Sequence, residues 1–460
     1  MSTPNIAQQL AQFAADLSWD SIPADVRIRA SHHILDAVGI AMAAGKQDFA
    51  QRAFNAMASL SGPGDVGVIG MPASLMPRDA AVINGFLCHS LDFDDTHQGG
   101  IVHPTSSAFP AALSSAMMNQ ATGQQLLVAY ILGVEVAARL GAVAQGGFHQ
   151  VGFHPTGVAG AFSSAIVAAK LSGMPAQETA HAQGIALSMA SGSMEFLEDG
   201  AWNKRLHPGW AAHAGMTAAA LAKQGFCGAT SPYEGRFGFY NAYLGALSEA
   251  CDLSLATSGL GKTWELMSTA IKPFPACHFT HAAIDSALAL RDNISNLNEV
   301  ESIVAKVPEG VIKTVCEPEA NKKRPANSYD AQFSIPYTIA AALISGNFSL
   351  AELEDNMIQN PEILALAEKV SYQADPDSTF PRYYTGEVII KTHSGQTLKH
   401  REEINRGAAE RPLSNEEIIE KFRANAATAA TKERVDAVEK LVLSIPFLET
   451  AKPLSQGLRG

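Results

Sequence analysis

Residues 157–171 read GVAGAFSSAIVAAKL, and this stretch decides the fold of the first half of the chain. Alanine and glycine are dense in it, as at Ala159, Gly160, Ala161 and Ala165. Small side chains let neighbouring helix axes approach closely. The stretch therefore predicts a helix in the interior of a tightly packed helical domain.

Helical patterns extend from this stretch in both directions, over about the first 265 residues. Ile6, Leu10, Phe13 and Leu17, for example, recur at the spacing of one helix face. The ranges expected to be helical are 6–17, 24–44, 77–91, 106–119, 124–141, 157–171, 176–191 and 210–223. An all-helical domain follows from this pattern.

The pattern changes after about Pro273. Alternating or β-branched runs predict short strands at 302–307, 370–373, 387–392 and 396–402, the last two joined by a hairpin turn. Helices are expected between them at 334–345 and 349–358. This segment indicates a smaller α+β unit.

Helices return near the C-terminus, where Ser414 and Glu417 form a capping box for a helix to about Asn425. Another helix is expected over 432–443. We expect a mainly α protein with a large all-helical domain and a smaller α+β lid domain. The first part of the helical domain would span 1–265 and the lid 266–408, with 409–460 returning to the helical domain.

Composition excludes several classes of protein. The chain has 460 residues, 47% apolar and 17% charged, which is typical of a soluble globule. Its net charge of −12 argues against nucleic-acid binding. Polar residues interrupt the uncharged run 111–134, which favours a buried helix over a membrane span, and no signal peptide is visible. Five cysteines without a CxxC pair signal no zinc or iron–sulfur cofactor. We expect a cytoplasmic protein.

One segment concentrates acids and histidines. Asp92, Asp94 and Asp95 follow an apolar helix, and His97 and His103 come close behind. Carboxylates are unfavourable at a helix C-terminus, so a lysine, a metal or protonation must offset them. A solvated acidic loop would explain the same residues. An Asp-Asp-x-x-Asp metal motif lacks its last acid, because residues 98 and 99 are Gln and Gly.

Further polar segments lie beside apolar helices. His154 comes just before a helix start, and Lys204, Arg205 and His207 precede a helix expected near Gly209. Lys272 and His281 lie at the seam between the expected domains, and residues 330–337 open a helix in the smaller unit. Each has a plainer interpretation as a helix cap, an exposed basic turn or a linker. Histidine before a helix start nevertheless suits acid–base chemistry, and clustered cations attract carboxylates.

Taken together, these segments offer cations for carboxylates, and histidines and acids for proton transfer. The chain has no nucleotide loop, redox motif or hydrolase elbow. This favours proton transfer next to a carboxylate, as in elimination, decarboxylation or epimerisation.

An ordered set of motifs resembles the MmgE/PrpD family over about residues 30–410. The motifs are HSLDFDDTH at 89–97 with His103-Pro104, GFHPTG at 152–157, the Lys-x-Leu-His-x-Gly turn at 204–209, KPFPACHFTH at 272–281 and AQFSIPY at 331–337. The family includes 2-methylcitrate dehydratases, cis-aconitate decarboxylases and iminodisuccinate epimerase. Its members have a helical domain with an α+β lid, form homodimers and need no iron–sulfur cluster.

The resemblance implies a cofactor-independent lyase for a small di- or tricarboxylic acid, with no metal. The catalytic residues it implies are Asp92, Thr96, His103, His154, Lys204 and Lys272. Arg205, His97, His207 and His281 are expected to bind substrate, with Lys204 and Lys272 on its carboxylates. The alternatives are an epimerase that uses the same site, a metal-dependent enzyme built on Asp92, Asp94 and Asp95, and a non-catalytic carboxylate-binding protein.

Overall fold

The computed structural model describes residues 4–380 and 382–460. It divides the chain into two units, one formed by residues 1–271 with 414–460 and the other by residues 272–413. The first unit is helical apart from two short strand pairs, whereas the second contains a four-stranded sheet.

The first unit is built from helices of very different length. Its helices are α1 (Ile6–Asp16), α2 (Ala24–Ala44), α3 (Asp48–Leu60), α4 (Pro77–His89), α5 (Thr105–Met118), α6 (Gly123–Val143), α7 (Gly147–Gln150), α8 (Pro155–Leu171), α9 (Ala176–Ala186), α10 (Phe196–Asp199), α11 (Asn203–Lys223), α12 (Phe239–Leu244), α20 (Asn415–Ala427), α21 (Lys432–Leu443) and α22 (Lys452–Gly457). Its strands pair as β1 (Val66–Gly67) with β2 (Ser74–Leu75), and β3 (Thr96–His97) with β4 (Thr269–Ala270).

Helix α8 forms the centre of this unit and is buried along most of its length. It packs against α11, α6, α5 and α9, as its small residues predict. The approach of α11 is so close that a Cβ added to Gly215 would lie 2.4 Å from the backbone nitrogen of Ala165. Glycine is required there because any side chain would separate the two helices.

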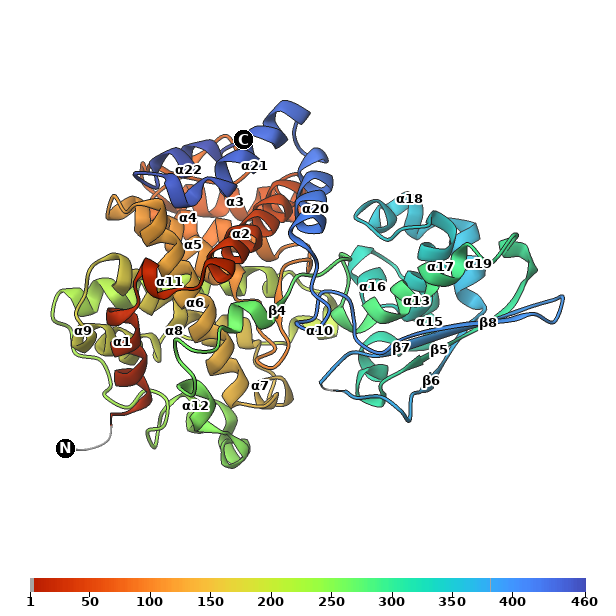
Figure 1. The fold of residues 1–460 in the computed structure, drawn as a ribbon, viewed down its shortest axis with the longest axis horizontal. Helices are drawn as coiled ribbons and strands as arrows, with labels where there is room; N and C mark the ends of the chain where they lie inside the picture. Colours follow the sequence, from red (N-terminus) through yellow and green to blue (C-terminus); the bar gives the residue numbers. More distant parts are fainter. Residues whose placement is uncertain (1–3, 381) are drawn as a thin grey trace. The chain divides into compact units, whose positions relative to one another are not determined.

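The C-terminal helices belong to the first unit. In Figure 1, α20 runs beside α2, at the opposite end of the sequence, and the two helices are in contact. A buried ion pair links them, with 2.7 Å between Lys421 Nζ and Asp36 Oδ1. The capping box of Ser414 and Glu417 is confirmed.

The uncharged run 111–134 is not one helix but the end of α5 and the start of α6. Among the described residues, α6 is the one helix long and apolar enough to cross a membrane, by length and composition. It is instead buried among other helices of its unit, including α5 and α8.

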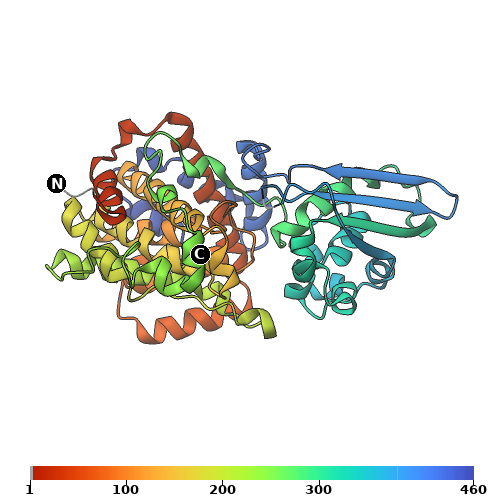
Figure 2. The same ribbon diagram turned by 90° about the horizontal axis from the view of Figure 1, so that it is seen from below.

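The second unit is a sheet covered by helices. Strands β5 (Val300–Val307), β6 (Val370–Ala374), β7 (Gly386–Thr392) and β8 (Thr397–Glu402) have the order β6-β5-β7-β8. Only β5 and β6 pair in parallel. The helices are α13 (His281–Arg291), α14 (Ile312–Val315), α15 (Glu319–Lys323), α16 (Ser328–Gln332), α17 (Ile335–Ser345), α18 (Asp355–Ile358) and α19 (Pro361–Glu368). Figure 1 shows α13, α17 and α19 over the sheet, and Figure 2 shows the long β7–β8 hairpin.

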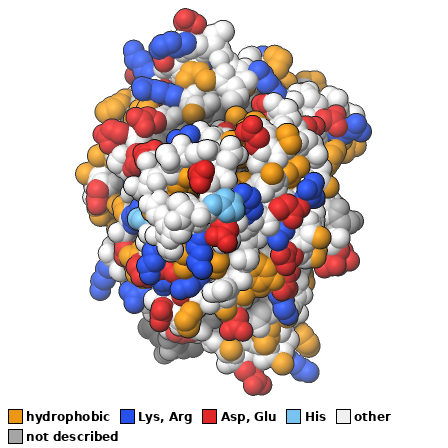
Figure 3. All heavy atoms as spheres, turned by 90° about the vertical axis from the view of Figure 1, so that its right-hand side faces the viewer, with side chains coloured by type: hydrophobic (Ala, Val, Ile, Leu, Met, Phe, Trp, Pro, Cys, Tyr) orange, Lys and Arg blue, Asp and Glu red, His pale blue; other side chains and the backbone are white. Residues whose placement is uncertain are grey.

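Surface charge on the face drawn in Figure 3 is mixed, with acidic and basic side chains interspersed. Such interspersion is typical of solvated protein surfaces.

Three expectations about helices are wrong. The helix expected over 176–191 ends at Ala186, and the one expected over 349–358 is a 3-10 turn followed by the short α18. Helices α3, α13 and α19 are among those that were not expected. The error at α11 affects the site: this helix begins at Asn203 and contains Pro208, so Lys204, Arg205 and His207 lie on a helix and not in a turn before it.

Candidate active site

Four histidines converge in the first unit because the ends of four helical segments meet. His89 is the last residue of α4, and His103 lies two residues before α5. His154 is the N-cap of α8, and His207 lies in the second turn of α11. Since α8 packs against both α5 and α11, their N-terminal ends bring the rings together.

The four rings form a compact, largely buried group, which we call the histidine cluster. The ring centroid of His89 lies 4.7 Å from that of His103 and 5.4 Å from that of His154. His154 and His207 approach to 3.1 Å between their Nδ1 atoms. His89, His103 and His154 are at most 9% exposed. Proton exchange between such neighbours and a bound molecule needs little movement.

Asp94 and a backbone carbonyl orient two of these rings. Asp94 Oδ2 lies 2.8 Å from His89 Nδ1, and Asp94 Oδ1 lies 3.5 Å from His103 Nδ1. His103 Nδ1 is also 2.8 Å from the carbonyl oxygen of Asp95 and 3.3 Å from Thr96 Oγ1. Because a carbonyl only accepts, His103 Nδ1 carries the hydrogen. In the neutral ring, the lone pair then sits on Nε2.

Asp95 anchors the loop that carries these groups. Its Oδ2 atom lies 2.7 Å from His33 Nδ1 on α2 and accepts a hydrogen bond from Thr105 Oγ1 at 2.5 Å. Tyr130 on α6 lies 2.6 Å from the same hydroxyl. All four side chains are buried, so this network fixes the carbonyl of Asp95 against His103.

Cations of α11 offset the remaining acid at the end of α4. Lys204 Nζ lies 2.6 Å from Asp92 Oδ1, and both side chains are largely buried. Arg205 donates from Nε to the carbonyl of Ser90 at 3.0 Å and stacks over the ring of Phe49. The acids after α4 therefore have partners within the protein: Asp92 has a lysine, and Asp94 and Asp95 have histidines. Asp92 thus contacts Lys204, and Asp94 and Thr96 contact His103.

Burial decides the charge of two rings. It lowers the pKa of His154 well below its ordinary value, and the neighbouring His89 and Lys204 lower it further. Burial likewise lowers the pKa of His207 to about 4, again with His89 and Lys204 contributing. Both rings are thus neutral near pH 7 and able to accept a proton. A bound anion would raise their pKa values and favour the protonated form.

The other three predicted residues have contacts of their own. His97 is held by Glu265 at 3.0 Å and accepts the N–H of Gly100 at 2.9 Å, so both of its nitrogens have partners. Lys272 and His281 belong to the second unit. There His281 begins α13, with its Nε2 atom 3.1 Å from the carbonyl of Ala276. The roles of these three residues stay predictions.

Sequence reasoning overlooked His89 and His33. His89 had a usable signal, because it opens the HSLDFDDTH motif and precedes Asp94 by five residues at a helix end. No local signal identifies His33, which lies 62 residues from its partner Asp95.

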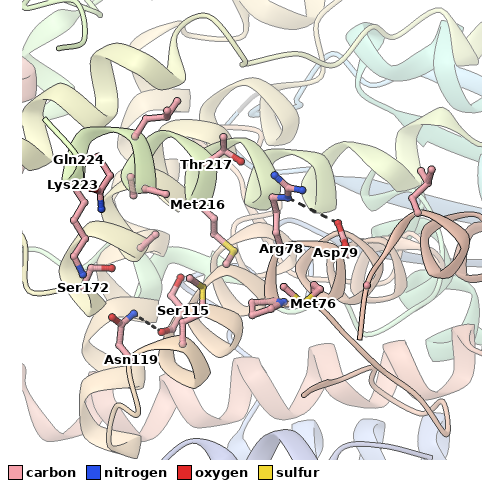
Figure 4. A pocket seen from close by; sticks show the side chains of 18 of the residues that line it. Met76, Arg78, Asp79, Ser115, Asn119, Ser172, Met216, Thr217, Lys223 and Gln224 are labelled. Atoms are coloured by element: carbon pink, nitrogen blue, oxygen red, sulfur yellow. Dashed lines mark hydrogen bonds and ion pairs between the residues drawn. The ribbon is translucent and has the colours of Figure 1, made fainter. Parts of the chain in front are cut away.

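A separate groove of about 1030 Å³ lies on the first unit, between α4, α5, α8 and α11 (Figure 4). Its lining is largely apolar, with Met76, Met118 and Met216, and includes the Arg78–Asp79 pair. No histidine lines it.

The chain is similar to known proteins over most of its length. The family model described as the MmgE/PrpD N-terminal domain matches residues 8–249, and that of the MmgE/PrpD C-terminal domain matches residues 274–445. Cis-aconitate decarboxylase of Homo sapiens is 30% identical over 84% of this chain and 80% of its own length. The enzyme of that name from Aspergillus terreus is 28% identical over 98% and 95%. 2-Methylcitrate dehydratase of Escherichia coli is 26% identical over 69% and 67%.

Proposed function

The chain belongs to the MmgE/PrpD family, and from this premise we propose that it is a lyase acting on a small tricarboxylic acid. The observation that carries the proposal is the histidine cluster beside Lys204. Decarboxylation of a cis-aconitate-like acid is the first candidate, because the relatives named cis-aconitate decarboxylase match more of the chain than those named 2-methylcitrate dehydratase. Dehydration of a 2-methylcitrate-like acid is the second.

Decarboxylation requires one proton and a place for negative charge. When the bond to the departing carboxylate breaks, CO₂ leaves and the electron pair stays with the unsaturated acid. A protonated histidine then supplies a proton to carbon. Substrate carboxylates favour that protonated form in the cluster, since opposite charge raises the pKa of a buried histidine. His103 and His154 are the proposed proton carriers.

Dehydration could use the same groups. A neutral ring such as His154 would remove the proton from the carbon beside a carboxylate, and a second, protonated ring would donate to the hydroxyl that leaves as water. In either reaction Lys204 stabilises charge that develops on a substrate carboxylate. Loss of one such contact typically costs about 3 kcal/mol in the transition state.

Proton NMR in D₂O with the full chain tests the reaction. The panel is cis-aconitate, 2-methylcitrate, citrate and iminodisuccinate. A new vinylic product from cis-aconitate identifies a decarboxylase, and one from 2-methylcitrate identifies a dehydratase. Deuterium entering without loss of substrate would identify an epimerase and overturn the lyase proposal.

Variants test the residues. We expect His103→Gln and Lys204→Met each to lower kcat/KM at least roughly 100-fold, equivalent to about 3 kcal/mol. Lys223→Met is the matched control, because Lys223 is exposed in the last turn of the same helix as Lys204. If both site variants fold and keep near-full turnover, the assignment to the histidine cluster is wrong.

A further inference from the structure

Three members of the histidine cluster have the arrangement of a metal site. His89, His103 and His154 each offer one nitrogen, and the three nitrogens lie within 4.8 Å of one another. Within residues 4–380 and 382–460, this is the one group of three or more His, Cys, Asp or Glu side chains that fits such a geometry. Three histidines with an open fourth position are a common ligand set for Zn²⁺.

The groups behind the rings match those of zinc proteins. A metal-binding histidine usually donates its other N–H to a carboxylate or a backbone carbonyl, which fixes the tautomer and the ring. His89 Nδ1 faces Asp94 Oδ2 at 2.8 Å, and His103 Nδ1 faces the carbonyl of Asp95 at 2.8 Å. Both contacts engage Nδ1, so Nε2 would be the atom that binds the ion in each ring. His154 is held on its Nδ1 side by His207.

The three nitrogens need to move only a short distance to coordinate one ion. With Zn–N bonds of about 2.0–2.1 Å in a tetrahedral site, the nitrogens are about 3.4 Å apart. Nitrogens within 4.8 Å of one another reach that spacing when each moves by less than about 1 Å. Rotation of the imidazole rings supplies a shift of that size without a change in the backbone.

Asp94 places a carboxylate beside two of the rings. Asp94 contacts both His89 and His103, and Asp92 and Asp95 lie in the same loop. Lys204 opposes them, but it is paired with Asp92. Attraction between a divalent ion and Asp94 is strong in this setting, because burial excludes the water that would screen it.

We propose that His89, His103 and His154 bind Zn²⁺, and that the bound ion inhibits the enzyme. The ion occupies the nitrogen lone pairs and leaves the rings unable to accept or deliver protons. Its open position would take a water molecule or a carboxylate. The inhibition rests on the proposed function, whereas the binding site stands on the geometry alone.

Binding is tested with Co²⁺, which reports a tetrahedral site by its visible absorption bands. We expect full-length protein treated with EDTA to bind one Co²⁺ per chain with these bands, and Zn²⁺ to displace it. His89→Gln and His154→Gln should abolish the bands. Asp94→Asn should weaken binding roughly 10–100-fold, the usual effect of losing a group behind a ligand.

The control is His213→Gln, on α11 but outside the cluster, where the ring stacks on Trp210. Circular dichroism verifies that each variant is folded. The site is refuted if Co²⁺ gives no tetrahedral bands, if both ligand variants still bind, or if His213→Gln weakens binding as much as they do.

Activity measurements distinguish the proposed metal site from the proposed lyase function. We expect Zn²⁺ to stop turnover of the substrate found by NMR, and EDTA to restore it. Turnover without Co²⁺ or Zn²⁺ binding would overturn the metal site and leave the lyase intact. Zn²⁺ bound at the three histidines with turnover unchanged would instead overturn their proposed role in proton transfer.

Discussion

Replacing Gly209 by alanine tests whether the close crossing of α4 and α11 holds the histidine cluster together. A Cβ at residue 209 would lie 2.0 Å from the carbonyl oxygen of Val82, where ordinary contact begins at 3.4 Å. The facing Gly85 is equally tight, since its own Cβ would lie 2.6 Å from Gly209 Cα. The two helices would therefore have to separate by more than about 1 Å.

The expected effect is the sum of two opposing contributions. Alanine is favoured over glycine in a helix by about 1 kcal/mol. Overpacking a tight contact costs about 1–3 kcal/mol, and more when the obstacle is backbone. We expect a net loss of about 2 kcal/mol in the free energy of unfolding. Because His89 ends α4 while Lys204 and His207 lie on α11, a separation near 1 Å should also lower kcat/KM about 100-fold.

Thermal unfolding and steady-state kinetics measure both effects, with Gly62→Ala as the control. A Cβ at exposed Gly62 would meet its nearest atom, Met76 Cγ, only at 3.9 Å. Wild-type stability and turnover in Gly209→Ala would refute the argument that this crossing positions the cluster.

Three further changes probe buried charges. Burial raises the pKa of Asp285 to about 6 from 3.8. Wild-type stability should therefore fall relative to Asp285→Asn by about 2 kcal/mol as pH rises from 4 to 7. Urea unfolding at both pH values would show no such change if the side chain titrates normally. Asp95→Asn should lower the free energy of unfolding by about 2 kcal/mol, because the hydrogen bond to His33 then lacks a charged acceptor. Equal urea midpoints for this variant and the wild type would contradict this. Lys421→Met should lower the free energy of unfolding by about 3–5 kcal/mol, because it removes the partner of the buried Asp36 carboxylate. We expect a smaller loss of stability at pH 5 than at pH 8, because burial raises the pKa of Asp36 to about 6.

Local sequence patterns predicted much of the fold. Strands β5, β7 and β8 and helices α2, α8 and α17 match their expected ranges closely, because hydrophobic periodicity and capping residues act within a few residues. Helix α11 was expected to begin near Gly209, after Pro208. Proline lacks an N–H and usually disrupts a helix interior. The helix nevertheless begins at Asn203 and accommodates the proline in its second turn.

The sequence by itself determined that the acids after α4 need partners. It also showed that the chain contains histidines and cations that can act as such partners. It also determined the family, through the order of its motifs. Only the tertiary structure decided which residues meet: Lys204 with Asp92 across 112 positions, His33 with Asp95 across 62, and His89 with His154. The physical reason is that packing of α8 against α5 and α11, and not any local preference, brings these helix ends together.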